Sequence, residues 1–411
     1  MPSTGIPPEL VTHIVDFLAG DDTSLRAVSL VSSQFRWPSQ RILFSTLHLR
    51  LRGPPWREDF LKNSPGVKLL RLMEGSPWIG DSIRSIRIDN AGRNWLAIDD
   101  SFPVAMGLLN LDKIEHFEVS RLIWSSLQVQ AKQVISAILG SPSLVSLSIT
   151  GAPIAVINCC SHSLKHLKIH NMFVAPLDLE GLMRRSPFRL QSLHVGRQIQ
   201  GHLVHIVDFL LDKTNQIDFS GVTQLSTHSE EHCLRLLWQA CNPCLKMLHI
   251  GSISESENRQ GRHHVSEGPL NLSGLINLRK VAISGMDSMF GTEDFHSWHL
   301  QRSSALLRTI LPSNLLEHIH IHLVYGFATS KFTITYQKNW QQLDDMLTTN
   351  MGQFWKLKTV EIELEEGFDG CGKPDRLENY IATSLPNIRS NGLFKLTRTS
   401  GKFYPFEEVE D

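Results

Sequence analysis

The chain has 411 residues, more than one ordinary compact core holds, which indicates several units or one elongated repeat domain. Its 40 Lys and Arg residues nearly balance its 41 Asp and Glu residues, so neither nucleic acid nor a membrane surface is predicted as a partner. Hydrophobic residues at 41% and charged residues at 20% exclude a disordered chain.

The first residues and the cysteines predict a reducing compartment. Glu9 and Asp16 interrupt the first apolar stretch and no basic segment precedes it, so a secretory signal is not expected. No apolar run approaches the length of a membrane-spanning helix. Six cysteines, of which Cys159 and Cys160 are adjacent, do not form the pattern of a disulfide framework. We therefore expect a cytoplasmic or nuclear protein.

A first helix is predicted to begin at Pro7 or Pro8, because proline is favoured in the first turn of a helix. Leu10, Ile14 and Leu18 recur every four residues and form an apolar stripe along it. The stripe is widened by two neighbours, Val11 and Val15. Gly-Asp-Asp at residues 20–22 ends this helix.

Two further helices are predicted before residue 50. The second is capped by Asp22 or Thr23, and the third begins near Pro38. The apolar side of the second helix consists of Leu25, Val28 and Val31. Three short helices expose more apolar surface than so small a unit can bury on itself, which indicates a partner.

This N-terminal segment resembles an F-box. The matching stretches are residues 6–10 (IPPEL), 14–18, 25–32 (LRAVSLVS) and 41–44, in the order and spacing of that family. Ile6 stands where the family often has Leu and Phe35 where it often has Trp, and both keep an apolar anchor. The resemblance implies that the segment binds a Skp-type adaptor, which links to a cullin and a RING subunit in an SCF-type ubiquitin ligase.

The adaptor contacts that the resemblance implies come from the first two helices. They are Ile6, Pro7, Pro8, Leu10, Ile14, Leu18, Leu25, Val28 and Val31. The alternative is that these residues only pack an ordinary helical subdomain against the rest of the chain.

Beyond about residue 80, apolar residues recur at positions i, i+3 and i+5. Nine such units begin at residues 83, 114, 144, 164, 190, 245, 278, 316 and 357, and a weaker tenth unit begins with Thr214. Residues two apart in a strand point to the same side, so each unit predicts a strand with one buried face that only stacked neighbours can cover. Helical spacing at 129–139, 205–213 and 230–240 places helices between strands. The predicted fold class is α/β.

The repeated units resemble divergent leucine-rich repeats, with parallel strands on a concave side and helices on a convex side. The predicted organisation is an F-box at 1–50, a linker or capping segment at 51–80, a degenerate solenoid of about ten units at 81–400 and an acidic tail at 401–411. The family's usual Asn after the strand motif is mostly missing, which argues against regular curvature. Residues 254–269 and 365–376 are expected to be exposed loops.

Histidines concentrate on the side of the predicted strands that faces solvent. Positions i+2, i+4 and i+6 hold eight of the chain's 19 histidines, far more than random placement would give. Histidine is an acceptable polar residue on an exposed strand; alternatively, the face binds a ligand and changes charge between about pH 5 and 8. The candidates for target contact on this face are Glu118, Lys168, His170, His194, Asp218, His249, His320 and His322.

Two patterns raise the question of a metal or redox site. Cys241 and Cys244 have the spacing of a thiol pair or half of a zinc site, and His318, His320 and His322 alternate along one strand. A zinc site needs further ligands, and Pro243 between the cysteines fits a repeat turn. We therefore predict no metal ligands.

No phosphate-binding glycine loop, nucleophile elbow or HExxH helix occurs, so no catalytic residue and no cofactor is predicted. The expected function is that of a non-catalytic substrate-recognition adaptor, whose repeat face binds an unknown target protein. The alternatives are a metal- or redox-active protein and a repeat scaffold outside any ligase.

Overall fold

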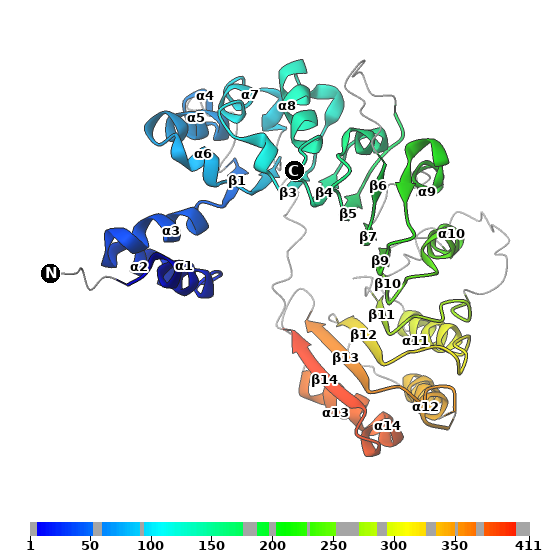
Figure 1. The fold of residues 1–411 in the computed structure, drawn as a ribbon. Helices are drawn as coiled ribbons and strands as arrows, with labels where there is room; N and C mark the ends of the chain where they lie inside the picture. Colours follow the sequence, from blue (N-terminus) through cyan, green and yellow to red (C-terminus); the bar gives the residue numbers. More distant parts are fainter. Residues whose placement is uncertain are drawn as a thin grey trace. The chain divides into compact units, whose positions relative to one another are not determined.

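The computed structural model describes residues 6–51, 60–90, 94–175, 187–196, 203–227, 231–251, 271–285, 294–325, 334–349, 352–366 and 374–399 (Figure 1). The chain divides into two compact units, Met1–Arg189 with Asp212–Ile217 and Leu190–Leu211 with Asp218–Asp411. Helices and parallel strands build both, which confirms the α/β class. The predicted tail and the predicted loop at 254–269 lie outside the described residues.

The first unit begins with a bundle of three helices, as predicted. They are α1 (Pro8–Phe17), α2 (Asp22–Val31) and α3 (Ser33–Leu43). The cap of α2 is Asp21, one residue earlier than predicted, since its carboxylate accepts hydrogen bonds from the N–H groups of Thr23 and Ser24 at 3.1 Å.

The predicted start of the third helix near Pro38 is wrong. The extended backbone of Ser32 ends α2, so α3 begins at Ser33 and Pro38 lies inside it. A proline within a helix removes one backbone hydrogen bond, and the packing of α3 against both other helices accommodates this loss.

Five parallel strands follow in the first unit, side by side in chain order. They are β1 (Thr46–Arg50), β2 (Ser85–Asp89), β3 (His116–Ser120), β4 (Ser146–Thr150) and β5 (His166–His170). Ile86, Phe117, Leu147 and Leu167 stand in one register and are buried, so the apolar triplets located these strands. The strand β1 was not predicted, because it lies before residue 80, where the repeated triplets begin.

Helices lie on one side of this sheet (Figure 1). They are α4 (Phe60–Asn63), α5 (Pro65–Gly75), α6 (Trp78–Ser82), η1 (Trp95–Ala97), α7 (Ser101–Met106), η2 (Leu111–Lys113), η3 (Trp124–Ser126), α8 (Val129–Leu139) and η4 (Ile154–Cys159). The expected linker at 51–80 is therefore helical where it is described. The ring of Trp78 lies 4.7 Å from that of Trp37 and 5.6 Å from that of Phe44, which joins α6 to α3.

The second unit contains seven parallel strands in one sheet. They are β7 (Ser192–Val195), β9 (Gln224–Thr227), β10 (Met247–Ile250), β11 (Lys280–Gly285), β12 (His318–Tyr325), β13 (Thr359–Glu366) and β14 (Phe394–Thr399). Helices lie on one side of this sheet as well (Figure 1). They are α9 (Leu203–Leu211), α10 (Glu231–Cys241), α11 (Asp294–Leu307), α12 (Ile334–Thr349), α13 (Pro374–Ser384) and α14 (Pro386–Ser390).

Two predictions for the chain beyond residue 200 need correction. The triplet starting at 214 forms η5 (Lys213–Asn215) and β8 (Ile217–Asp218), which pairs with β6 (Phe188–Arg189) in a separate two-stranded sheet. The large sheet uses β9 instead, where Leu225 is buried between polar neighbours. The expected loop at 365–376 begins inside β13 and ends inside α13, and residues 367–373 lie outside the described part.

Buried amide side chains join neighbouring turns of the second unit. Asn314 is 3% exposed, donates hydrogen bonds to the carbonyls of Leu272 and Leu275, and accepts one from the Leu311 N–H. Asn277 makes one such link, to the carbonyl of Pro243, at a more exposed position. Among the helices that the structure describes, none has both the length and the apolar character needed to cross a bilayer.

Replacing Asn314 by Ala should lower the free energy of unfolding by about 1–3 kcal/mol, because buried backbone groups lose their partners. The matched variant Asn277→Ala should cost less, since water can replace its single bond. Chemical denaturation of both variants measures the difference. Equal losses would contradict the role assigned to Asn314.

Candidate functional site

The strand register of the second unit assembles histidines that are far apart in the sequence. His194, Ser226, His249, Ala282 and His320 stand in one row across five neighbouring strands. All five lie on the side of the sheet opposite the buried apolar residues that face the helices. Three of the predicted contact residues thus come together in one row. The triplet pattern could not predict this row, because it does not give the register between strands.

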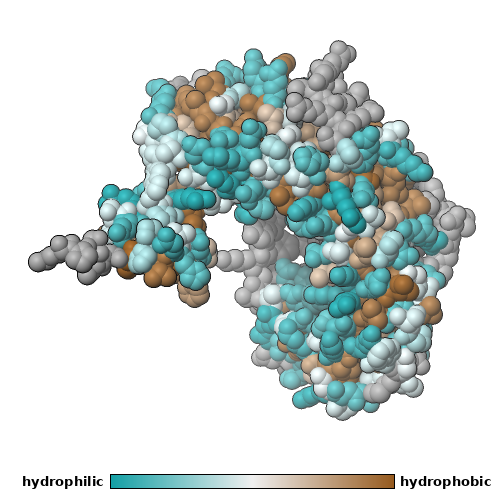
Figure 2. Space-filling model, viewed as in Figure 1, coloured by the Kyte–Doolittle hydropathy of each residue, from teal (hydrophilic) through white to brown (hydrophobic). Residues whose placement is uncertain are grey.

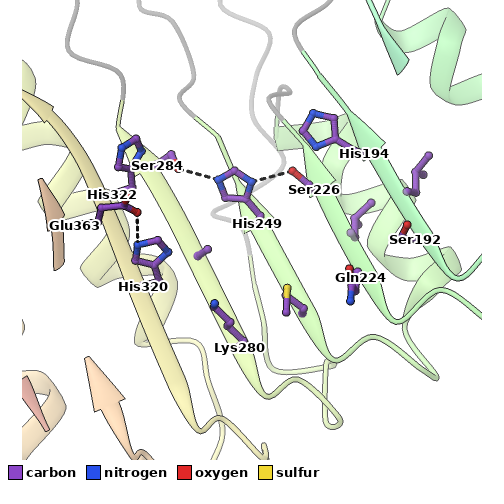
Figure 3. Close-up of a pocket in the computed structure, with 14 residues that line it drawn as sticks. Ser192, His194, Gln224, Ser226, His249, Lys280, Ser284, His320, His322 and Glu363 are labelled. Atoms are coloured by element: carbon purple, nitrogen blue, oxygen red, sulfur yellow. Dashed lines mark hydrogen bonds and ion pairs between the residues drawn. The ribbon is translucent and has the colours of Figure 1, made fainter. Parts of the chain in front are cut away.

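A groove with a volume of about 490 Å³ lies over this row (Figure 3). We call it the histidine groove. It is lined by Ser192, Leu193, His194, Gln224, Leu225, Ser226, Met247, His249, Lys280, Ala282, Ser284, His320, His322 and Glu363. Most of its lining residues have polar side chains, so it offers hydrogen-bonding groups beside the apolar surface of Leu193, Leu225, Met247 and Ala282.

Two hydroxyl groups hold the imidazole of His249 near the middle of the groove. Its Nδ1 lies 2.8 Å from Ser226 Oγ and its Nε2 lies 2.7 Å from Ser284 Oγ (Figure 3). A hydroxyl can donate or accept, so both tautomers of the ring fit. The ring is therefore fixed in orientation while its proton can occupy either nitrogen.

Two histidines of β12 lie close to carboxylates of β13. His320 Nε2 lies 2.9 Å from a carboxylate oxygen of Glu363, and His322 Nε2 lies 2.9 Å from one of Glu365. The His320 contact is short, but the two groups are poorly aligned for a hydrogen bond. The direct register partners of His320 and His322 are Glu361 and Glu363. Each imidazole therefore contacts the carboxylate two residues further along β13.

Burial lowers the pKa of His320 below its ordinary value, because the charged ring would lose its hydration. The carboxylates of Glu363 and Glu361 oppose this effect, and the Lys280 ammonium adds to it. The net direction is downward, so His320 is mainly neutral at neutral pH. It retains the capacity to gain a proton if negative charge approaches.

Partners on β14 engage the carboxylates of β13. Glu361 accepts from Lys395 Nζ at 2.6 Å and from Thr397 at 3.3 Å, and the Lys395 hydrogen bond lowers the pKa of its carboxyl group. Glu363 accepts from Thr399 at 3.1 Å. Glu361 thus has a cationic partner on the side away from the groove, whereas the partner of Glu363 there is a neutral hydroxyl.

Lys280 differs from the other charged groups of this face. It is half-buried in the groove, and no described carboxylate lies within ion-pair distance of its ammonium group. Its direct register partners are Met247 and His318, neither of which carries negative charge.

The remaining candidates for target contact lie elsewhere. Glu118, Lys168 and His170 belong to the sheet of the first unit, where Glu118 pairs with Arg87 at 3.3 Å. Asp218 lies on β8 in the two-stranded sheet, so its placement on the same face as the histidines is wrong. The sequence also places Lys280 and Glu363 on this face of the predicted strands, although neither was among the candidates for target contact. Ser284 has the same alternation in its unit but was not selected, and Ser226 was missed because it lies on β9, which no triplet marks.

The N-terminal bundle presents a second candidate surface. Of the residues that the F-box resemblance implies, Ile6, Pro7, Pro8, Leu10, Ile14 and Val31 are exposed, and Leu18 and Val28 are half-buried. Leu25 is fully buried, so it has no surface to offer a partner and is removed from the predicted contacts.

The predicted apolar stripe on α1 divides into two faces. Val11 and Val15 point into the bundle, whereas Leu10, Ile14 and Phe17 are exposed. A helical period of 3.6 residues places Phe17, seven residues after Leu10, on the exposed face and turns Leu18 away from it. The spacing of four residues that defined the predicted stripe assigns Leu18 to this face and omits Phe17.

The exposed set also includes a residue of α2, Leu30, that sequence analysis did not select. We use the name apolar bundle surface for Ile6, Leu10, Ile14, Phe17, Leu30 and Val31. Brown surface on the lower side of the bundle in Figure 2 corresponds to α1 and α2.

The cysteine pattern is a poor match to redox chemistry. Cys241 is fully buried at the end of α10, and burial raises the pKa of its thiol to about 12. A protonated thiol is a weak nucleophile and a weak metal ligand. Within the described residues, no three His, Cys, Asp or Glu side chains gather as a metal-binding group.

Comparison with known proteins adds no family. No protein-family model and no curated protein sequence matches this chain. The functional argument therefore depends on the histidine groove and the apolar bundle surface.

The titration of His320 provides a direct check of the groove. Its midpoint should lie below that of an exposed histidine, and Glu363→Gln should lower it further by removing a charge that favours the imidazolium. Imidazole resonances followed by NMR, assigned with His320→Gln, measure both. The control Glu118→Gln should leave the midpoint unchanged; a rise in Glu363→Gln would contradict the electrostatics.

Proposed function

We propose that this protein is a non-catalytic substrate-recognition adaptor of an SCF-type ubiquitin ligase, acting in the cytoplasm or nucleus. Its N-terminal bundle binds a Skp-type adaptor, and the open faces of its sheets hold a target protein. The observation that carries the proposal is the exposure of the apolar bundle surface.

That exposure is unusually large for single side chains. Leu10 is 53%, Phe17 88% and Leu30 80% exposed, although each is large and apolar. Removing such a side chain from water contributes roughly 1.5–3 kcal/mol, so a partner that covers several of them gains substantial affinity.

The bundle also keeps a core of its own. Val11, Val15 and Leu25 are buried between the helices, and α3 is joined to α6 through Trp78. The bundle therefore does not need the exposed residues to form its core. They form an additional face on a folded unit, which supports a docking role.

A Skp-type adaptor is the partner whose chemistry fits. The residues of this face belong to the F-box-like stretches at 6–10, 14–18 and 25–32, and they are apolar. An amphipathic helix binds a partner by laying such a face into an apolar groove. The resemblance and the exposure pattern thus support the same partner, independently of each other.

The open sheet faces complete the proposal. Neither ligase assembly nor target binding requires catalytic groups on this chain, because tethering replaces a dilute encounter by a high effective concentration. The polar histidine groove supplies a place for the target in the second unit.

Adaptor binding tests the proposal. The double variant Leu10→Asp/Ile14→Asp should lose co-purification with a coexpressed Skp-type adaptor, since two carboxylates would be buried without partners. The matched control Val104→Asp/Leu108→Asp changes equally exposed apolar residues of the first unit and should retain the adaptor. Unchanged binding in the first variant, or none in the wild type, would favour a scaffold outside any ligase.

A second pair of variants separates the core from the docking face. Leu25→Ala should lower the free energy of unfolding by about 2–5 kcal/mol, because it opens a cavity in the bundle. Leu30→Ala should leave stability nearly unchanged and weaken adaptor binding. Thermal unfolding and a binding titration on both variants measure the two effects, and a stability loss confined to Leu30→Ala would contradict the assignment.

A further inference from the structure

The histidine groove contains a hollow of defined chemistry over Ala282. The neighbours of Ala282 across the strands are His249 and His320, and its neighbours on the same face of β11 are Lys280 and Ser284. The methyl group of Ala282 is much smaller than any of these side chains. A small group can therefore reach the sheet between two imidazoles, an ammonium and a hydroxyl (Figure 3).

Lys280 and Glu363 place opposite charges on two sides of this hollow, the ammonium on β11 and the carboxylate beyond His320 on β13. Lys280 forms no ion pair with a described residue, whereas Glu361 is held by Lys395 and Glu363 is shared by His320 and Thr399. A half-buried ammonium without a carboxylate partner attracts an anion more strongly than an exposed one, because less water screens it.

The hydroxyl groups can also direct a hydrogen-bond donor into this hollow. If Ser226 donates to His249 Nδ1, then His249 Nε2 carries the hydrogen and donates to Ser284 Oγ. The proton of the Ser284 hydroxyl is then available to a ligand in the hollow. This chain of hydrogen bonds gives an oxyanion a second donor besides Lys280.

We propose that the hollow over Ala282 binds an oxyanion, a carboxylate or phosphate group, carried by an acidic segment of the target protein. The inference rests on the proposed function in taking the occupant to be a target protein. Lys280 supplies the charge, Ser284 supplies a hydrogen bond, and the small size of Ala282 admits the group.

Acid pH should strengthen this binding. His320 faces Lys280 on β11 and both Glu361 and Glu363 on β13, and burial lowers its pKa in the free chain. A bound oxyanion favours the imidazolium, so binding is coupled to proton uptake by His320. The affinity for a carboxylate ligand should therefore rise as the pH falls from 8 to 6.

Fluorescence anisotropy of labelled peptides on the purified full chain tests the inference. The probes are hexaglutamate, a glycine-rich peptide with one phosphoserine, and hexalysine. We expect at least one anionic probe to bind and hexalysine to bind more weakly. Preference for hexaglutamate identifies a carboxylate, and preference for the phosphoserine peptide identifies a phosphate.

Variants of the hollow provide the control. Lys280→Gln should weaken the anionic probe about tenfold, the usual loss for a charge-assisted hydrogen bond. Lys338→Gln, which changes an exposed lysine of the helix α12 on the other side of the sheet, should have no effect. Ala282→Leu should block the hollow while keeping the charge; if it fails to fold, Lys280→Gln decides.

Three results would overturn the inference: no binding of either anionic probe, equal weakening by Lys338→Gln and Lys280→Gln, or stronger binding of hexalysine. Adaptor co-purification should be unaffected in all groove variants. A failed groove with intact adaptor binding would thus reject the oxyanion site alone, whereas failure of the adaptor test would reject the ligase assignment.

Discussion

The alternation of side chains along parallel strands is the constraint on which both sheets depend. Residues such as Leu248, Ile319 and Val360 are buried toward the helices, so the residues between them must face the other way. The parallel register then fixes which of these outward residues become neighbours. Burial of the apolar rows therefore positions polar side chains that make no contribution to the core, and the histidine groove is a consequence of how the core is built.

The same alternation explains how much of the fold the sequence predicts. Apolar triplets located most strands because their buried side is purely apolar. They failed at β9, where Leu225 and Thr227 form the buried side and Thr227 does not look apolar. They also missed β14, in which no residue is fully buried, as expected of a strand at the edge of a sheet. On the N-terminal bundle, the exact helical period decided that Phe17 is exposed and Leu25 buried.

The groove could be predicted only in part. Alternation alone indicated that His194, His249 and His320 share one side of their strands. Their meeting in one row required the register, which depends on packing against helices across gaps of unequal length in the sequence. The bonds from His249 to Ser226 and Ser284 arise from side chains on different strands, and so does the absence of a described carboxylate within ion-pair distance of Lys280. No pattern within one segment contains that information.

The edge strand β14 has a consequence for the groove that its weak burial does not suggest. The carboxylates of Glu361 and Glu363 stand beside His320 and would make this end of the groove negative. Lys395 neutralises the first, and Thr399 directs one oxygen of the second toward the edge. The positive charge of Lys395 reduces the negative potential at this end of the groove, and Lys280 supplies a positive charge on the β11 side. A strand that adds little to the core thus changes the field in which a ligand would bind.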